Sequence, residues 1–405
     1  MINQQIFQFP IVYSNAFLMG KVATGWGSHQ TAGDECEALK IKKALITTTG
    51  LKGTGIVDEI KGILEYKGIS TEIFSGVTSN PKDYQIMEAY KVFKEAGCDG
   101  VVSVGGGSSH DCGKGLRIVA ANDGRYVCDF AAFIDPPWMK EIKKYKPVTI
   151  PQVCVNTTTG TGAEVTGGAL VSNTKVRAKH MCMVPGVSPN VAINDPLLMR
   201  MQPQNIAAWT GFDALTHAFE SYICRSPSRY NKAMMLQSMK LIFENLREFS
   251  YNRMNHVACE NMCWAASMAG IGLGFGGGAG VVHGLMHGLS ALYDVHHGLT
   301  NAVFTIPGER FNQPACPEKF AEMTETMGID IRGMTKMEAS DCWFEEIERL
   351  LDDLEIESGN LSRFGLTKED CTHIVQNQYL NDFARQGNPK DFQFDEYVKL
   401  LEDNL

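Results

Sequence analysis

GVVSVGGGSSHD, residues 100–111, is an apolar β-branched run followed by three glycines and by residues that can start a helix. Glycines at such a turn let backbone N–H groups approach a phosphate closely, and a helix N-terminus adds partial positive charge. The stretch therefore predicts a strand–turn–helix unit that can hold the pyrophosphate of a dinucleotide. A tight connection without a ligand fits the same residues, because the pattern is not Gly-x-Gly-x-x-Gly.

The chain on either side of this stretch, from about residue 40 to 195, alternates short apolar runs with amphipathic segments of helix length. We predict strands at 43–48, 71–74 and 100–104, helices at 56–67, 83–96 and 109–121, and further strand-like segments at 147–155, 168–172 and 190–194. Alternation of this kind is typical of a parallel sheet with helices on both faces.

The second half of the chain has a different pattern, with apolar residues at helical spacing in segments such as 230–245, 253–270 and 339–354. We expect no strand there. Prolines at 185, 189 and 196 interrupt any long element, so the boundary between an α/β domain and an all-α domain is predicted near them.

A second loop, NTTTGTGAEVT at 156–166, directly follows a predicted strand and presents several hydroxyl groups. Such hydroxyls suit ribose and phosphate, but they also cap helices by accepting from free N–H groups. Two loops of this type in one α/β domain favour a nucleotide.

A group of histidines and one carboxylate points to a metal. Asp213 and His217 are four residues apart, hence on one face of a helix, and His283 and His287 repeat that spacing before His297. Imidazole nitrogens and a carboxylate suit Fe²⁺, Zn²⁺ or a similar first-row metal. No glutamate follows His283, so the His-Glu-x-x-His site of a metalloprotease is disfavoured.

The composition excludes several other classes of function. The 405 residues carry a net charge of -9, with 37 scattered Lys and Arg, which argues against nucleic acid or an anionic membrane as partner. Residues 1–7 lack the basic region and apolar run of an export signal, and no membrane-spanning run follows. Twelve cysteines without a Cys-x-x-Cys pair are typical of reduced thiols. We expect a cytoplasmic enzyme with a small-molecule substrate.

With both halves analysed, the sequence resembles the iron-containing, or group III, alcohol dehydrogenases over nearly its whole length. The motifs that carry the resemblance are GGGSSHDCGKG (105–115), NTTTGTGAEVT (156–166), INDPLLM (193–199), TGFDALTHAFESY (210–222) and VHGLMHGLSALYDVHHG (282–298). The resemblance implies a dehydroquinate synthase-like fold, with a Rossmann-like nucleotide-binding α/β domain at 1–190 and an all-α metal-binding domain at 191–405. The branch that looks most similar contains 1,3-propanediol dehydrogenases, methanol dehydrogenases and methanol-oxidising nicotinoproteins.

The resemblance also implies roles for single residues. The ligands of Fe²⁺, or of Zn²⁺ or another divalent metal, would be Asp213, His217, His283 and His297. His287 matches a histidine that is not a ligand but lies near the nicotinamide, on the proton path. The positions that match cofactor contacts for NAD or NADP are Asn80, Gly106, Gly107, Ser108, Asp111, Thr157, Thr158, Thr161, Thr166, Lys179, Leu198 and His287. The implied substrate is a small primary alcohol or its aldehyde, and the implied assembly is a homodimer or a larger homo-oligomer, such as a decamer.

This chain departs from the family pattern at three places, the first of which bears on cofactor specificity. NAD-specific relatives usually carry an aspartate at the end of the second strand, where this chain reads ITTTG at 46–50, so NADP(H) is admissible. The segment 274–280 is richer in glycine than in relatives, and His296 stands where relatives usually have proline.

Three alternative functions differ in chemistry from an alcohol dehydrogenase that releases its cofactor. A nicotinoprotein, acting as an alcohol:acceptor oxidoreductase or formaldehyde dismutase, would keep NADP(H) tightly bound, and retention of nucleotide through gel filtration would reveal it. A metal-dependent lyase of the dehydroquinate synthase type would share the fold. A non-catalytic binding protein is disfavoured, because all four expected ligand positions are filled.

Overall fold

The computed structural model describes residues 20–132, 144–275, 277–382, 384–391 and 393–405. The N-terminal stretch 1–7 and Gly276 of the glycine-rich segment lie outside the described residues. Within the described residues, no helix combines the length and apolar character that crossing a membrane requires.

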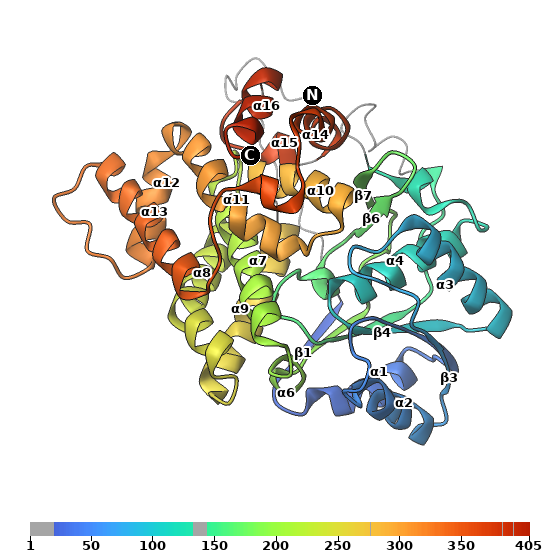
Figure 1. Ribbon diagram of the computed structural model, residues 1–405. Helices are drawn as coiled ribbons and strands as arrows, with labels where there is room; N and C mark the ends of the chain where they lie inside the picture. The colour runs from blue at the N-terminus through green and yellow to red at the C-terminus, as the bar shows by residue number, and fades with distance from the viewer. Residues whose placement is uncertain (1–19, 133–143, 276, 383, 392) are drawn as a thin grey trace, which may run out of the picture.

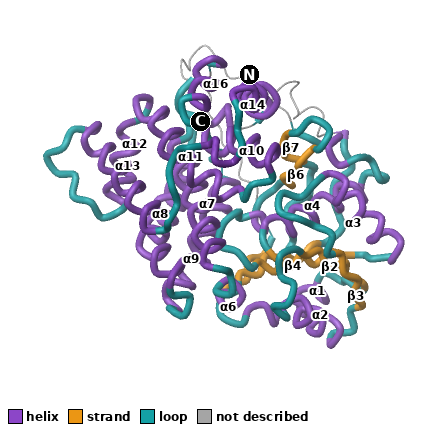
Figure 2. Tube along the Cα trace, viewed as in Figure 1, coloured by secondary structure: helices purple, strands orange, loops and turns teal. Residues whose placement is uncertain are grey.

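The first half of the chain forms a six-stranded sheet in which all neighbouring strands are parallel. The strand order is β1 (Lys21–Thr24), β8 (Val191–Asn194), β5 (Gln152–Asn156), β4 (Gly100–Gly105), β2 (Lys43–Thr48) and β3 (Ser70–Phe74). This confirms the expected parallel sheet, which Figure 2 shows as one band of strands.

Helices cover both faces of the sheet, as the alternation predicted. On one face, α1 (Ala32–Ala38) and α2 (Ile56–Tyr66) pack on a core that includes Ile46 and Val104. On the other face, α3 (Asp83–Ala96) and α4 (Gly107–Ala121) pack on Leu45 and Val101 (Figure 1). Adjacent residues of one strand thus enter opposite cores, which is why these buried strands are apolar on both sides.

The sequence located most of these elements closely but missed others. The expected strand at 147–155 begins only at Gln152, after Pro147 and Pro151. Strands β1 and β7 (Ala178–Cys182) were not predicted, because β1 is short and β7 carries a lysine and a histidine. β7 pairs antiparallel with β6 (Ala169–Asn173) in a separate hairpin, which contacts α10 (Val281–Tyr293).

The second half is helical, and its described residues contain no strand beyond β8. Besides α10, its helices are α6 (Pro196–Met199), α7 (Gln204–Ile223), α8 (Arg229–Tyr251), α9 (His256–Gly274), α11 (His297–Asn312), α12 (Pro317–Thr326), α13 (Lys336–Asp353), α14 (Lys368–His373), α15 (Ala384–Gly387) and α16 (Phe394–Glu402). Their inner faces form one continuous apolar core. β8 lies after residue 190 and pairs with β1 and β5, so the hydrogen bonding of the sheet extends past the predicted domain boundary. The division into domains at residue 190 stays a prediction.

Candidate active site

The glycine-rich turn joins β4 to α4, as the sequence predicted. Gly105 has φ of 141°, a backbone conformation that favours glycine, and Gly106 stands before the first turn of α4. No side chain of the described residues caps this helix end. The N–H groups at this end are therefore not satisfied by a capping side chain, which is a feature of anion-binding helix N-termini.

The second loop lies against this turn. A Cβ on Gly106 would lie 2.8 Å from Thr158 Cγ2, and a Cβ on Gly107 would lie 2.7 Å from Thr161 Oγ1. Thr157 N donates to the carbonyl of Gly105 over 3.0 Å. The two predicted nucleotide loops thus meet where β4 and β5 end, and any side chain on either glycine would fill the approach.

Asn80 and Lys179 also meet, although 99 residues separate them. Lys179 Nζ donates to Asn80 Oδ1 over 2.7 Å, and Asn80 Nδ2 donates to Asp294 Oδ1 over 3.1 Å and to the carbonyl of Val295 over 3.2 Å. Burial lowers the pKa of Lys179 to about 8. This pair holds the loop that leads directly into His297.

The remaining predicted cofactor positions differ in their surroundings. Asp111 forms an ion pair of 2.8 Å with Lys114, a fully buried residue that the sequence did not single out. Lys114 Nζ also donates to Thr166 Oγ1 over 3.4 Å. Ser108 is half-buried in the first turn of α4, whereas Leu198 is packed in the apolar core beneath the sheet.

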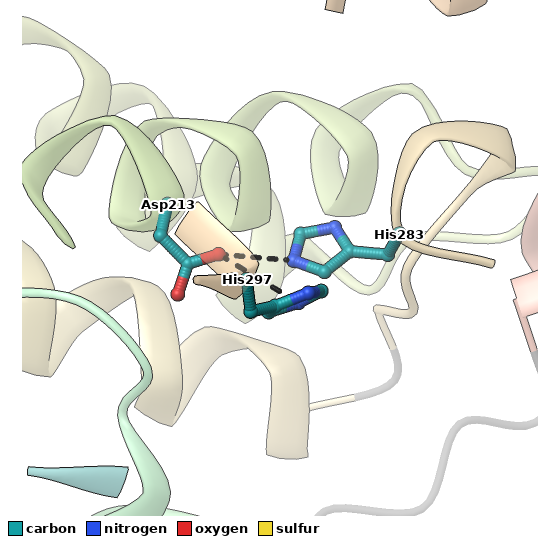
Figure 3. A group of neighbouring side chains, drawn as sticks. All are labelled: Asp213, His283 and His297. Atoms are coloured by element: carbon teal, nitrogen blue, oxygen red, sulfur yellow. Dashed lines mark ion pairs between the residues drawn. The ribbon is translucent and has the colours of Figure 1, made fainter. Parts of the chain in front are cut away.

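The candidate metal group brings together Asp213 from α7, His283 from α10 and His297 from the start of α11 (Figure 3). One ligand atom from each residue lies within 4.8 Å of the other two. The Oδ1 atom of Asp213 is 3.5 Å from His283 Nε2 and 3.9 Å from His297 Nε2. Helix α7 and the consecutive helices α10 and α11 therefore present one oxygen and two nitrogens to a common point.

Three other histidines surround this group. The ring of His217 stacks on His283 with centroids 4.3 Å apart, but His217 is not one of the three converging residues. His287 stacks on His297 at 4.8 Å. His296 lies instead against Trp209, with centroids 5.2 Å apart. Its neighbour His297 is therefore the one that joins the group.

The electrostatics differ among the histidines of this group. Burial opposes protonation of His283, but Glu220 and Asp213 raise its pKa to about 9, so a metal that binds there must displace a proton. Burial lowers the pKa of His217 to about 3 and that of His297 well below its usual value, so both rings are neutral, as ligands must be. Burial opposes ionisation of Asp213, but His217, His283 and Asn301 lower its pKa below the ordinary value. Among the described residues, the buried His283 Nε2 has no hydrogen-bond partner. A buried imidazole nitrogen left unpaired in this way fits a first-row divalent metal.

Two family models together match almost all of the described chain. The model for iron-containing alcohol dehydrogenase matches residues 20–196, and the model for the C-terminal part of the Fe-containing alcohol dehydrogenase family matches residues 207–405. The chain belongs to the iron-containing alcohol dehydrogenase family. It is therefore an oxidoreductase, which excludes the lyase and the non-catalytic binding protein as alternatives.

Relatives of this iron-containing alcohol dehydrogenase cover nearly its full length. It is 35% identical to methanol:N,N-dimethyl-4-nitrosoaniline oxidoreductase of Amycolatopsis methanolica, over 98% of this chain and 88% of the relative. Identity to 1,3-propanediol dehydrogenase of Citrobacter freundii is 37%, over 89% and 92% of the two chains. A crystal structure of 1,3-propanediol oxidoreductase superimposes with a TM-score of 0.88 at 34% identity, covering 97% of this chain and all of the other.

Two polar residues of this alcohol dehydrogenase that sequence analysis did not single out support the metal group. Asn301 Nδ2 donates to Asp213 Oδ1 over 2.8 Å, and the Glu220 carboxylate accepts from His283 Nδ1. The sequence does contain an indication for Asn301, because it follows His297 by four residues and so lies on the same face of α11. Glu220 shares α7 with Asp213, but nothing local indicates that its partner lies on α10.

A third residue missed by the sequence supports His287. Asp382 Oδ2 accepts from His287 Nδ1 over 2.9 Å and from Gln378 Nε2 over 2.9 Å. His287 and Asp382 are 95 residues apart, and no spacing rule connects them. The bond leaves His287 Nε2 as the ring nitrogen that can exchange a proton.

Proposed function

We propose that this chain is a metal- and NAD(P)-dependent alcohol dehydrogenase that oxidises small primary alcohols, of the methanol, ethanol and propanediol class, to aldehydes, or catalyses the reverse. The observation that carries the proposal is the convergence of Asp213, His283 and His297 beside the second nucleotide loop. Thr159 of that loop lies 3.3 Å, hydroxyl to hydroxyl, from Thr210, which precedes Asp213 by less than one helical turn. The nucleotide loop therefore contacts α7 within one helical turn of the metal group.

The residues of the candidate site would have separate roles in such a reaction. When bound, a divalent metal at this group supplies Lewis acidity to the substrate oxygen, and the nicotinamide ring exchanges the hydride. Asp213, His283 and His297, with His217 as the proposed fourth ligand, fix where the substrate oxygen lies. His287 is held by Asp382 and accepts the hydroxyl proton at Nε2.

Burial contributes to the same reaction. Asp213 and His283 are almost fully buried, and the wall behind them is the apolar core of the helical domain. A dry site strengthens the electrostatic effect of each ligand and prevents hydride loss to water.

We infer that the cofactor site accepts the 2′-phosphate of NADP(H). The stretch from Ile46 to Gly55, at the end of β2 and beyond, contains no carboxylate, so nothing in it repels a phosphate. Thr47 Oγ1 donates to the carbonyl of Ser109 over 3.0 Å, which ties the end of β2 to the first turn of α4. The ribose would then lie near Thr48 or Thr49, at the end of β2.

The nicotinoprotein alternative has specific support as well. Three relatives at 33–36% identity are methanol:N,N-dimethyl-4-nitrosoaniline oxidoreductases. Their name describes electron transfer from methanol to N,N-dimethyl-4-nitrosoaniline. By this alternative, the chain would keep its nucleotide through turnover and reduce the same acceptor without added NAD(P)⁺.

The experiment that tests both uses one preparation. Purified protein is passed through gel filtration, its bound nucleotide is released and identified, and metal-free protein is reloaded with Fe²⁺ or Zn²⁺. Straight-chain C1 to C6 alcohols, with 2-propanol as the secondary-alcohol control, are assayed with NAD⁺, with NADP⁺ and with N,N-dimethyl-4-nitrosoaniline. We expect metal-dependent oxidation of the short primary alcohols. Failure of every primary alcohol with metal-loaded protein would refute the proposal.

A further inference from the structure

The N-terminus of α10 is capped by side chains from distant parts of the chain. Its own N-cap residue, Gly280, has no side chain to offer. Val281 N donates to Asn388 Oδ1 over 3.0 Å, and Val282 N donates to Glu220 Oε1 over 2.7 Å. His283 N donates to the other carboxylate oxygen of Glu220 over 3.3 Å. The first turn of α10 is thus fixed from α7, where a carboxylate also complements the helix dipole.

The same carboxylate holds the side chain of His283. Glu220 Oε2 accepts from Nδ1 of the imidazole, and both side chains are buried. With Nδ1 occupied as a donor, Nε2 is the nitrogen left for a ligand, and it faces Asp213 Oδ1 at 3.5 Å. A carboxylate that accepts from the remote nitrogen of a metal-binding histidine fixes its tautomer and orientation and raises its basicity.

We propose that Glu220 is a positioning residue of the metal centre. Its carboxylate fixes both the backbone N–H of His283 and the Nδ1 atom of the imidazole. This inference rests on the proposed metal site. Glu220 does not belong to the converging ligand group itself. Its side chain is fully buried, and an ionised carboxylate is costly there unless it is paired. Its three donors, from Val282 N, His283 N and His283 Nδ1, provide that pairing.

Gly280 supports this arrangement by its missing side chain. A Cβ at Gly280 would lie 2.7 Å from Glu220 Oε1 and 3.2 Å from Asn388 Oδ1. Such distances are shorter than side chains normally tolerate, so an alanine would push the carboxylate away from the first turn of α10. Glycine at position 280 therefore leaves room for the Glu220 carboxylate to contact both the first turn of α10 and the side chain of His283.

A neighbouring carboxyl group provides a matched control. Glu309 is also fully buried, and burial together with the negative charge of Glu220 raises its pKa well above the usual value. Asn312 Nδ2 donates to Glu309 Oε2 over 3.2 Å. Glu309→Gln therefore changes a buried carboxyl group whose hydrogen-bond partner is Asn312 rather than His283, whereas Glu220→Gln places an amide N–H₂ against the donors of His283.

The test measures Co²⁺ affinity of metal-free full-length protein by competition with a chromophoric chelator, with the visible spectrum of bound Co²⁺ as a second readout. We expect Glu220→Gln to weaken binding about 10- to 100-fold, and Glu309→Gln to leave it nearly unchanged. The visible spectrum of bound Co²⁺ should also change in Glu220→Gln, because Glu220 acts through the orientation of His283. If Glu220→Gln fails to fold, Glu220→Asp, which keeps the charge but shortens the reach, is expected to weaken binding in the same direction.

The outcomes separate this inference from the proposal on which it rests. Wild-type protein that binds no Co²⁺ refutes the metal site itself. Normal wild-type binding, with Glu220→Gln within twofold of it, overturns the role of Glu220 alone. Weakened binding with an unchanged Co²⁺ spectrum also overturns it, because Glu220 would then act on the fold in general.

Discussion

Gly107→Ala tests whether the two nucleotide loops interlock as the structure shows. The new Cβ would lie 2.7 Å from both Oγ1 and Cγ2 of Thr161. Ordinary carbon contacts are about 3.5–4.0 Å, so Thr161 or the start of α4 must shift by nearly an ångström. Overpacking of this kind costs about 1–3 kcal/mol. If this free-energy cost destabilises the nucleotide-binding conformation, the Kd for the nucleotide rises by about 5- to 150-fold.

The assay is titration of the protein with NADH and NADPH, followed by nucleotide fluorescence, with Tm measured in parallel. Gly62→Ala is the matched control, because Gly62 is an exposed residue within α2 and a Cβ there would meet nothing within 4 Å. The control should keep Kd and gain about 0.5–1 kcal/mol of stability. A Gly107→Ala variant that binds both nucleotides within twofold of wild type would refute the placement of the cofactor across these loops.

Four further predictions address other residues. His217→Ala should lose bound metal while remaining folded, because the ring lies against His283; full metal content by elemental analysis would remove His217 from the ligand set. His287→Ala should retain metal but slow alcohol oxidation by about 10²- to 10⁴-fold in single-turnover measurements, and an unchanged rate of the chemical step would contradict its role in proton transfer. Thr48→Asp should weaken NADP(H) binding more than NAD(H) binding, and a wild-type preference for NAD(H) of a hundredfold, about 2.7 kcal/mol, would show that another group reads the ribose. The buried His29, which precedes α1, lies 2.5 Å from Asp195 Oδ2 through Nδ1 and 3.0 Å from Glu59 Oε1 through Nε2. Burial opposes protonation of His29, but Asp195 and Glu59 raise its pKa above the value in the unfolded chain. The stability that this ion pairing provides is therefore complete below the unfolded pKa and is lost as pH rises through the folded pKa. The free energy of urea unfolding should therefore fall more for His29→Gln near pH 6 than near pH 9, and an equal loss at both would contradict the assignment.

Local patterns in the sequence determined much of this molecule. The β-branched runs at 43–48 and 100–104 and the helical period at 83–96 gave elements with the observed bounds or within one residue of them. Such periods follow from backbone geometry, which repeats every two or every 3.6 residues regardless of what packs nearby. The same regularity placed Asp213 and His217 on one helix face, and glycines at a strand end indicated the turn.

Only the tertiary structure decided which elements meet and what supports the site. β1 and β7 have weak local patterns, and their strand conformation depends on hydrogen bonds from β8 and β6. The contact of Glu220 with His283 spans 63 residues, and that of Asp382 with His287 spans 95. Periodicity carries no information about such pairs, because they depend on how whole helices pack rather than on the conformation of neighbouring residues.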